Sequence, residues 1–140
     1  MRPLVILLSL LWMLAASAPA EAMNARQKLR LEQVQNAWSS ALRWSDYEGA
    51  WQLVDPAERA ARPLTELELE RYRQLQVSSY REGGSGELED GRVVRDVEVG
   101  VINRHTQAER IIRFQERWRW DREARRWWQD GRLPDFWAGE

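Results

Sequence analysis

The feature that most constrains the fold is a change in the spacing of apolar residues at Gln76. Before Gln76, apolar side chains recur every three or four positions, as at Leu31, Val34 and Trp38, which is typical of one stripe of an amphipathic helix. After it, apolar and polar residues alternate, as on strands that bury one face. The chain is therefore expected to be α+β, with N-terminal helices packed in the concave face of a curved antiparallel sheet of about four strands.

The helical half is divided by recognisable start signals. The first helix is expected over residues 25–44. Ser45 and Glu48 then form a capping-box pattern, which predicts that both side chains satisfy backbone donors ahead of a short helix through residues 51–54. The remaining start signals are Asp55 followed by Pro56, and Thr65 followed by Glu68.

The second half contains four segments with the alternation of strands, separated by turn residues. The glycine-rich stretch 83–86 and the pair Asp90 and Gly91 are interpreted as turns, and the polar stretch 104–107 as a hairpin loop. The expected strands are residues 77–81, 92–103, 108–121 and 125–130.

The hairpin loop fixes a register for the two longest strands. With residues 104–107 in the loop, Asn103 lies opposite Ala108, and a shift of two residues would keep the faces while changing the partners. The expected buried-face pairs are Val99–Ile112, Val97–Phe114, Arg95–Glu116 and Val93–Trp118. The expected solvent-face pairs are Glu98–Arg113, Asp96–Gln115 and Val94–Arg117.

One polar pair interrupts the apolar face, because Glu116 lies between Phe114 and Trp118 with Arg95 across from it. An isolated buried carboxylate costs several kcal/mol, so it needs a partner or water. Two interpretations follow: an open pocket that grips a polar ligand, or a cross-strand ion pair near a wet edge of the core. The candidate pocket residues are Glu116, Arg95, Tyr72, Tyr80, Trp118 and Trp120, which could equally be packed core.

The first residues have the layout of a cleavable secretory signal. Arg2 precedes an apolar run over residues 4–16, about 13 residues long against the roughly 20 of a membrane-spanning helix. Small residues follow, and cleavage is expected after Ala20 or Ala22, although an uncleaved membrane anchor is the alternative. We therefore expect residues 1–22 to be a signal peptide, residues 23–140 to be one domain, and the protein to be periplasmic or secreted.

Composition limits the partners and the sources of stability. Cleavage at Ala22 removes one basic and one acidic residue, so the net charge stays at −1 and attraction to nucleic acid is not expected. The chain has no cysteine, which rules out disulfides and a lipid-modified cysteine. Stability must come from packing, to which eight of the nine tryptophans are available after the leader.

The order of elements and two stretches of sequence resemble the nuclear transport factor 2-like (cystatin-like, SnoaL-like) superfamily. The stretches are WSDYEGAWQLVDP from Trp44, and RWRWD from Arg117 together with the closing residues 127–137. The resemblance covers residues 25–137 and implies a cone in which the sheet encloses the first helix. It says little about activity, since the superfamily includes isomerases and dehydratases as well as non-catalytic domains.

No catalytic residue is assigned. The resemblance implies an acidic or histidine base inside the cone, but Asp46 falls on a turn where helix capping explains it, and His105 falls on a hairpin loop. Without cysteine and with one histidine, no metal site and no cofactor are expected. In the 113–128 run, Trp118 and Trp120 face away from the arginines at 113, 117 and 119 and are expected inside, which argues against attachment to a membrane surface or to glycan. No stable membrane insertion is expected after signal cleavage.

The expected function is non-catalytic binding, in the cell envelope, of a partner protein or a small apolar ligand. The alternative is a small-molecule isomerase or dehydratase that uses Glu116 in the cone pocket. The outer sheet face, with Arg113, Arg117 and Arg119 beside acidic neighbours, is either a contact surface or homodimer interface, or an ordinary solvated face.

Overall fold

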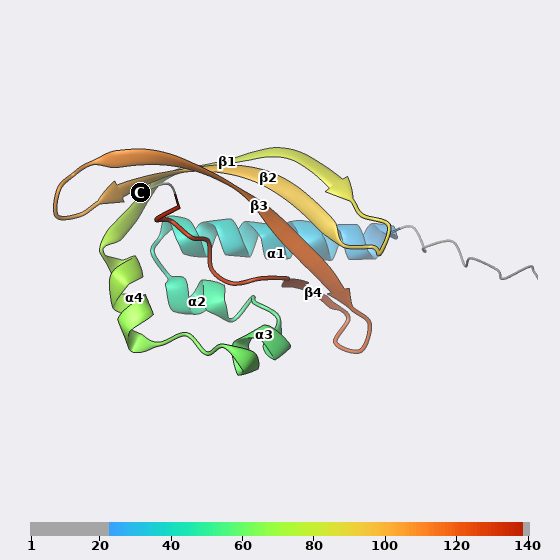
Figure 1. Cartoon of the computed structure of the whole chain (residues 1–140). Helices are drawn as coiled ribbons and strands as arrows, with labels where there is room; N and C mark the ends of the chain where they lie inside the picture. Colours follow the sequence, from blue (N-terminus) through green and yellow to red (C-terminus); the bar gives the residue numbers. More distant parts are fainter. Residues whose placement is uncertain (1–22, 139–140) are drawn as a thin grey trace, which may run out of the picture.

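The computed structural model describes residues 23–138, so the expected leader, residues 1–22, lies outside the described residues. Within this range four helices precede a four-stranded antiparallel sheet of order β1-β2-β3-β4, which confirms the predicted α+β class. The sheet bends over the long first helix, and the shorter helices lie below it (Figure 1). The elements are α1 Ala25–Arg43, α2 Tyr47–Trp51, α3 Pro56–Ala61, α4 Glu66–Arg73, β1 Leu75–Glu87, β2 Val93–Asn103, β3 Glu109–Asp121 and β4 Arg126–Gln129.

A capping box starts α1 and the apolar stripe orients it. The Asn24 side chain accepts a hydrogen bond from the Gln27 backbone at 2.9 Å, and the Gln27 side chain accepts one from the Asn24 backbone at 3.0 Å. One turn later the stripe buries Leu31, Trp38 and Leu42. The stripe therefore turns the Trp38 face of α1 toward the sheet.

The prediction that Ser45 caps α2 was wrong. Ser45 adopts a left-handed backbone conformation with φ of 58°, so the chain reverses there and the helix begins after the next residue. Asp46 is the cap, and its Oδ1 accepts the Gly49 N–H at 2.9 Å. The Glu48 carboxylate pairs instead with the Arg73 guanidinium of α4 at 2.9 Å. The start signals of α3 and α4 were correct: Asp55 caps α3, with Pro56 as its first residue, and Thr65 with Glu68 forms a capping box at α4.

The predicted register of β2 and β3 is confirmed. The Asn103 N–H donates to the Ala108 carbonyl at 2.9 Å, which places the hairpin loop where the polar stretch indicated. All the pairs expected from this loop are formed, on the buried face and on the solvent face: Val99–Ile112, Val97–Phe114, Arg95–Glu116, Val93–Trp118, Glu98–Arg113, Asp96–Gln115 and Val94–Arg117.

The prediction that the glycine-rich stretch 83–86 is a turn was wrong, because β1 continues through it to Glu87. Ser85 pairs with Arg95 and Gly86 with Val94, after bulges at Val77/Ser79 and Glu82/Ser85. Glycine has no side chain to show an alternating pattern, yet its backbone still pairs. β1 is therefore a long edge strand with an exposed second half.

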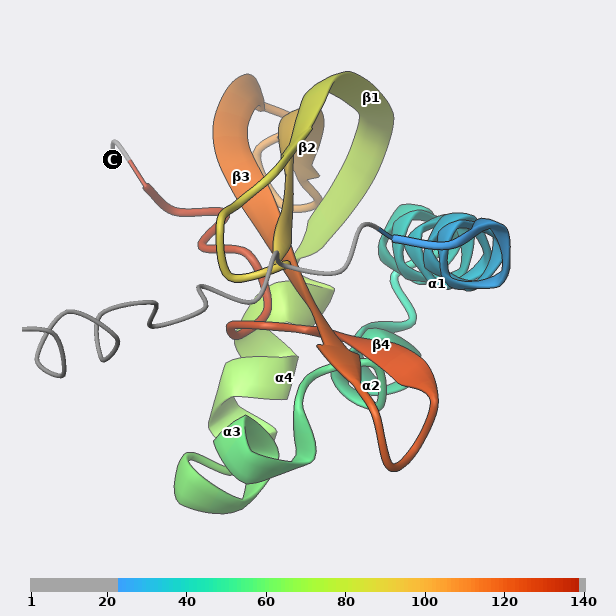
Figure 2. The ribbon, with the colours of Figure 1, turned by 90° about the vertical axis from the view of Figure 1, so that its right-hand side faces the viewer.

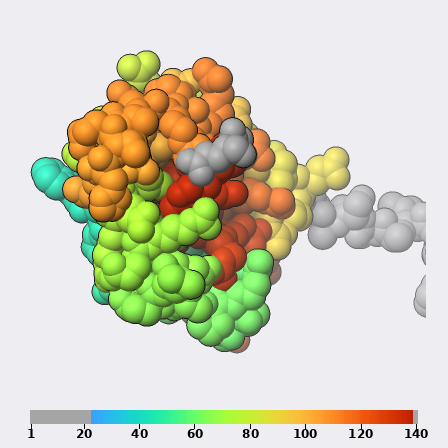
Figure 3. Space-filling view, turned by 60° about the vertical axis from the view of Figure 1, so that its left-hand side comes forward, coloured from blue at the N-terminus to red at the C-terminus, as the bar shows by residue number. Residues whose placement is uncertain are grey.

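The C-terminal segment closes the core after β4. It turns back between α4 and the hairpin that joins β2 to β3, where it is visible in red in the space-filling view (Figure 3). Leu133 and Phe136 are buried, and the Pro134 carbonyl accepts the Tyr72 hydroxyl at 2.8 Å. The rings of Tyr72 and Phe136 meet edge to face at 5.9 Å. Figure 2 shows the ribbon from the side, with α4 below the sheet.

Candidate functional site

Four of the six predicted pocket residues meet around one carboxylate. Glu116 lies on β3, directly opposite Arg95 on β2, and its side chain points to the buried face with no exposed surface. Trp118 follows two residues later on the same face, and Tyr80 reaches the carboxylate from β1. We call these residues, together with Trp38 of α1, the Glu116 cluster.

Every oxygen of the Glu116 carboxylate is engaged. Arg95 donates from Nε to Oε2 at 2.9 Å and from a terminal nitrogen to Oε1 at 3.0 Å, in the two-pronged geometry that suits a guanidinium and a carboxylate. The Trp118 indole N–H donates to Oε2 at 3.0 Å, and the Tyr80 hydroxyl donates to Oε1. Four donors fill the acceptor capacity of a carboxylate.

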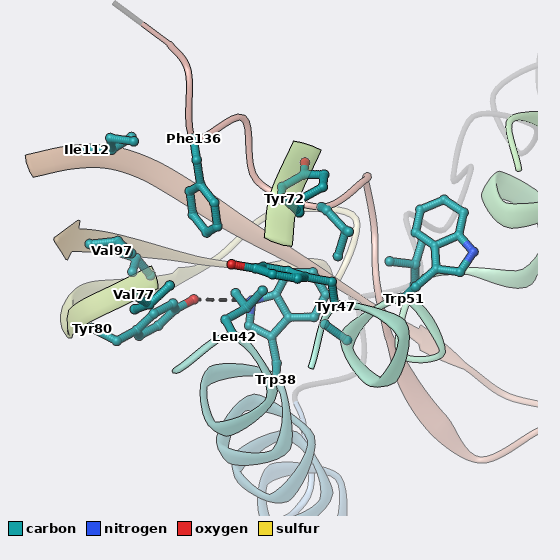
Figure 4. Close-up of a cluster of buried hydrophobic side chains, with 14 of the residues drawn as sticks. Trp38, Leu42, Tyr47, Trp51, Tyr72, Val77, Tyr80, Val97, Ile112 and Phe136 are labelled. Atoms are coloured by element: carbon teal, nitrogen blue, oxygen red, sulfur yellow. Dashed lines mark hydrogen bonds between the residues drawn. The ribbon is translucent and has the colours of Figure 1, made fainter. Parts of the chain in front are cut away.

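The cluster extends to α1 through an indole. The Trp38 Nε1–H donates to the Tyr80 hydroxyl oxygen at 3.2 Å, the bond drawn dashed among the buried side chains in Figure 4. The Trp38 and Trp118 rings also meet edge to face at 5.9 Å. Burial, and next the Glu116 charge, raise the pKa of Tyr80 far above its usual value, so this phenol stays a donor. The cluster therefore links α1, β1, β2 and β3.

The charge of Arg95 is divided between the core and the rim of the sheet. Its third nitrogen lies 3.5 Å from Glu82, whose side chain is 43 % exposed. The Arg95 side chain is 9 % exposed, so its pair with Glu116 is shielded from water. Removing either partner would leave the other charge buried without its partner. Arg95 and Glu116 form the cross-strand ion pair of the second interpretation, but Glu116 is fully buried instead of lying near a wet edge.

In this arrangement the carboxylate cannot exchange a proton with a small molecule. A general acid or base must lie within about 3 Å of the reacting atom. The atoms at that distance from Glu116 are the side-chain donors of Arg95, Tyr80 and Trp118. The interior around them is filled by aromatic rings and branched aliphatic side chains (Figure 4). The geometry can hold the sheet to the helix, and turnover would require the cluster to open.

The other two predicted pocket residues lie elsewhere. Tyr72 packs at the far end of the core, with its ring 5.0 Å from that of Tyr47 and 4.9 Å from that of Trp137. Trp120 stacks near Trp127 at 5.5 Å and lines a cavity of about 240 Å³ beside the start of α1. The six predicted pocket residues therefore do not form one site.

The surface residues that the sequence raised as candidates for catalysis or binding lie outside the Glu116 cluster. Asp46 caps α2 and His105 lies exposed on the hairpin loop. On the outer sheet face, Arg113 pairs with Glu98 at 2.9 Å. Arg119 turns to Asp55 at 2.7 Å. Among residues 23–138 no group of three histidine, cysteine or acidic side chains is placed to hold a metal ion.

The residue that sequence reasoning missed is Trp44. It ends α1 and its side chain is 83 % exposed, the most of any large apolar residue in the described part of the chain. The signal was available: two residues beyond Leu42 on a helix is about 200° around the axis, so Trp44 cannot share the buried stripe.

No protein-family model matches the chain, and no curated protein matches it at a significant level. Between residues 23 and 138, none of the helices is both long enough and apolar enough to cross a bilayer.

Proposed function

We propose that this is an exported, nuclear transport factor 2-like domain that binds a partner protein in the cell envelope through its surface, without catalysis. One observation carries the proposal: the Glu116 carboxylate in the core is fully buried and accepts hydrogen bonds from four donors. A core closed in this way leaves the surface as the place for binding.

Two further features support the proposal. The leader pattern in residues 1–22 favours export, and the order of helices before a bent sheet agrees with the superfamily that the sequence resembles. Large apolar side chains are exposed at separate places on the described surface, and indole and guanidinium groups are the side chains that most often dominate protein interfaces. The exposed apolar residues are Leu29, Trp44, Leu67, Leu88 and Ile111.

Export is tested by expressing the full chain in a bacterium and measuring the mass of the product in the periplasmic fraction. The expected product starts at Glu21 or Met23, which corresponds to cleavage after Ala20 or Ala22. A full-length product that stays with the membrane would contradict cleavage, and a full-length product in the cytoplasm would contradict export.

Binding through the surface is tested by placing a photo-cross-linking amino acid at exposed positions of the full chain in its native cell. Cross-links from at least one exposed position to another protein are expected, and cross-links from a buried position such as Val99 are not. A cell-wide absence of cross-links from every exposed position would contradict the proposal.

A further inference from the structure

Trp44 projects from the end of α1 into solvent beside the first part of β1. Trp38, the aromatic residue within α1, is fully buried, whereas Trp44 is 83 % exposed. In the space-filling view, cyan atoms from the end of α1 project at the left edge of the molecule (Figure 3). An indole left in water is the kind of side chain that becomes an interface anchor when a partner covers it.

A groove of about 500 Å³ lies next to this indole. Its walls are Arg43 and Trp44 from α1 and five consecutive residues of β1, numbers 77–81. We call it the Trp44 groove. β1 is the edge of the sheet, and a bulge at Val77/Ser79 turns the edge at this point. A wall made of five consecutive strand residues fits an extended chain better than a compact ligand.

Three arginines lie at or next to the groove and can pair with carboxylates of a partner. Arg43 donates to the Tyr80 carbonyl at 2.8 Å, and Arg104, next to the groove, donates to the Ser45 hydroxyl at 3.3 Å. Arg81 is exposed and lies opposite Glu98, which is already engaged by Arg113. Among the described residues, none of these three guanidinium groups, of Arg43, Arg81 and Arg104, has a carboxylate within salt-bridge distance.

Two neighbouring carboxylates make hydrogen bonds to groups other than these arginines. Glu109 accepts the Ser78 hydroxyl at 2.8 Å, and Asp46 caps α2. The groove therefore combines an exposed indole, an apolar floor from Val77 and Tyr80, and arginines that form no salt bridge with the described residues. This combination is complementary to an extended segment that carries carboxylates and an apolar side chain.

We propose that the Trp44 groove binds an acidic, extended segment of a partner protein, with an apolar side chain of that segment against Trp44 and its carboxylates at Arg81 and Arg104. This inference rests on the proposed function, because it names the surface through which the partner is held. Desolvating the arginines in the complex strengthens their pairing with carboxylates, which makes charge the basis of specificity.

The test places p-benzoylphenylalanine, an aromatic photo-cross-linker, at position 44 of the full chain, with positions 67 and 111 as controls. Leu67 and Ile111 are exposed by 80 % and 53 % on other elements, so their replacement is equally harmless to folding. The cross-linked peptide is identified by mass spectrometry. We expect position 44 to cross-link to a segment rich in Asp and Glu, and Arg81→Glu to reduce that product about tenfold. Arg117→Glu, an exposed charge reversal on the outer sheet face, is expected to leave it unchanged.

The other outcomes separate this inference from the proposed function. Cross-links from position 67 or 111 but not from 44 would keep partner binding and overturn the Trp44 groove as its site. Cross-links from position 44 to phospholipid, or to a segment without acidic residues, would also overturn the inference. An absence of cross-links from every exposed position would remove the proposed function as well. Circular dichroism melts that match those of the parent chain confirm that each variant is folded.

Discussion

At the scale of single residues, the Tyr80 hydroxyl connects the two sides of the Glu116 cluster. It donates to the Glu116 carboxylate and accepts from the Trp38 indole, so one oxygen connects the sheet to α1. Each of these bonds satisfies a group that has no access to water. Removing a shared partner leaves two buried polar groups short of a bond, which costs more than the net value of one ordinary hydrogen bond.

We therefore expect Tyr80→Phe to lower the free energy of unfolding by about 2–4 kcal/mol, measured by urea denaturation. The matched control is Tyr72→Phe, which removes a single bond to the Pro134 carbonyl and is expected to cost about 1 kcal/mol. Equal losses in the two variants would show that the Tyr80 hydroxyl has no special role.

At the scale of elements, Asp55 ties a short helix to the sheet. Its Oδ1 caps α3 by accepting the Ala57 N–H at 3.0 Å, and its Oδ2 lies 2.7 Å from Arg119 on β3. The backbone of Asp55 also bonds to the sheet, because its N–H donates to the Gln129 carbonyl of β4 at 3.0 Å. α3 buries none of its own residues, so these polar contacts hold it in place.

Asp55→Ala is expected to lower the free energy of unfolding by about 2–3 kcal/mol, because it removes both the cap of α3 and the buried carboxylate partner of Arg119. Thr65→Ala is the control, since it removes a cap from α4 alone and should cost about 1 kcal/mol. Thermal or urea unfolding of both variants makes the comparison, and a smaller loss for Asp55→Ala than for Thr65→Ala would contradict this role.

The elements also show what the sequence could predict. The long hairpin was predictable pair by pair, because a polar loop at residues 104–107 and strict alternation leave little freedom in a local connection. The pairing of Arg95 with Glu116 followed from that register alone. The continuation of β1 through residues 83–86 was not predictable, since glycines carry no alternation and their pairing depends on a neighbouring strand.

The rest of the site depends on contacts between distant segments. Tyr80 and Glu116 are 36 residues apart, and Trp38 and Tyr80 are 42 apart, so no local pattern shows that they meet. Tyr72 and Trp120 share the aromatic character of the cluster but point to other parts of the core. Composition can indicate which residues are buried, while the curvature of the sheet decides which of them touch.

At the scale of the whole molecule, the core is closed around aromatic rings. The three tyrosines of the chain, Tyr47, Tyr72 and Tyr80, are all buried, and burial raises the pKa of each above the ordinary value of 10.0. A raised pKa means that the folded state keeps the phenol proton more tightly than the unfolded chain does. The stability that this provides is complete below pH 10 and is lost as the pH rises above it.

The expected result of an alkaline titration is that phenolate absorbance stays absent past pH 10 and then rises together with loss of the folded circular dichroism signal. All three phenols should titrate in that one transition, because each needs the core to open. A reversible phenolate signal near pH 10 in the folded protein would contradict the closed core.

The central claim is that the buried carboxylate of Glu116 is structural. Glu116→Gln tests this claim, because glutamine keeps the shape of the side chain and removes its charge. In Glu116→Gln, Arg95 would lose its buried counter-charge and keep only the exposed Glu82 at 3.5 Å, and the new amide nitrogen would face a guanidinium donor. Two controls bracket the effect. Glu82→Gln, at the exposed partner of Arg95, should cost less than about 1 kcal/mol, and the double variant Arg95→Met with Glu116→Leu should recover most of the loss.

The decisive measurement is the free energy of unfolding of Glu116→Gln in urea. We predict a value lower than that of the parent chain by about 3–5 kcal/mol, which is a large part of the stability of a small domain. A variant as stable as the parent chain would contradict the account, because a carboxylate that can lose its charge without cost is one reserved for a ligand or for chemistry.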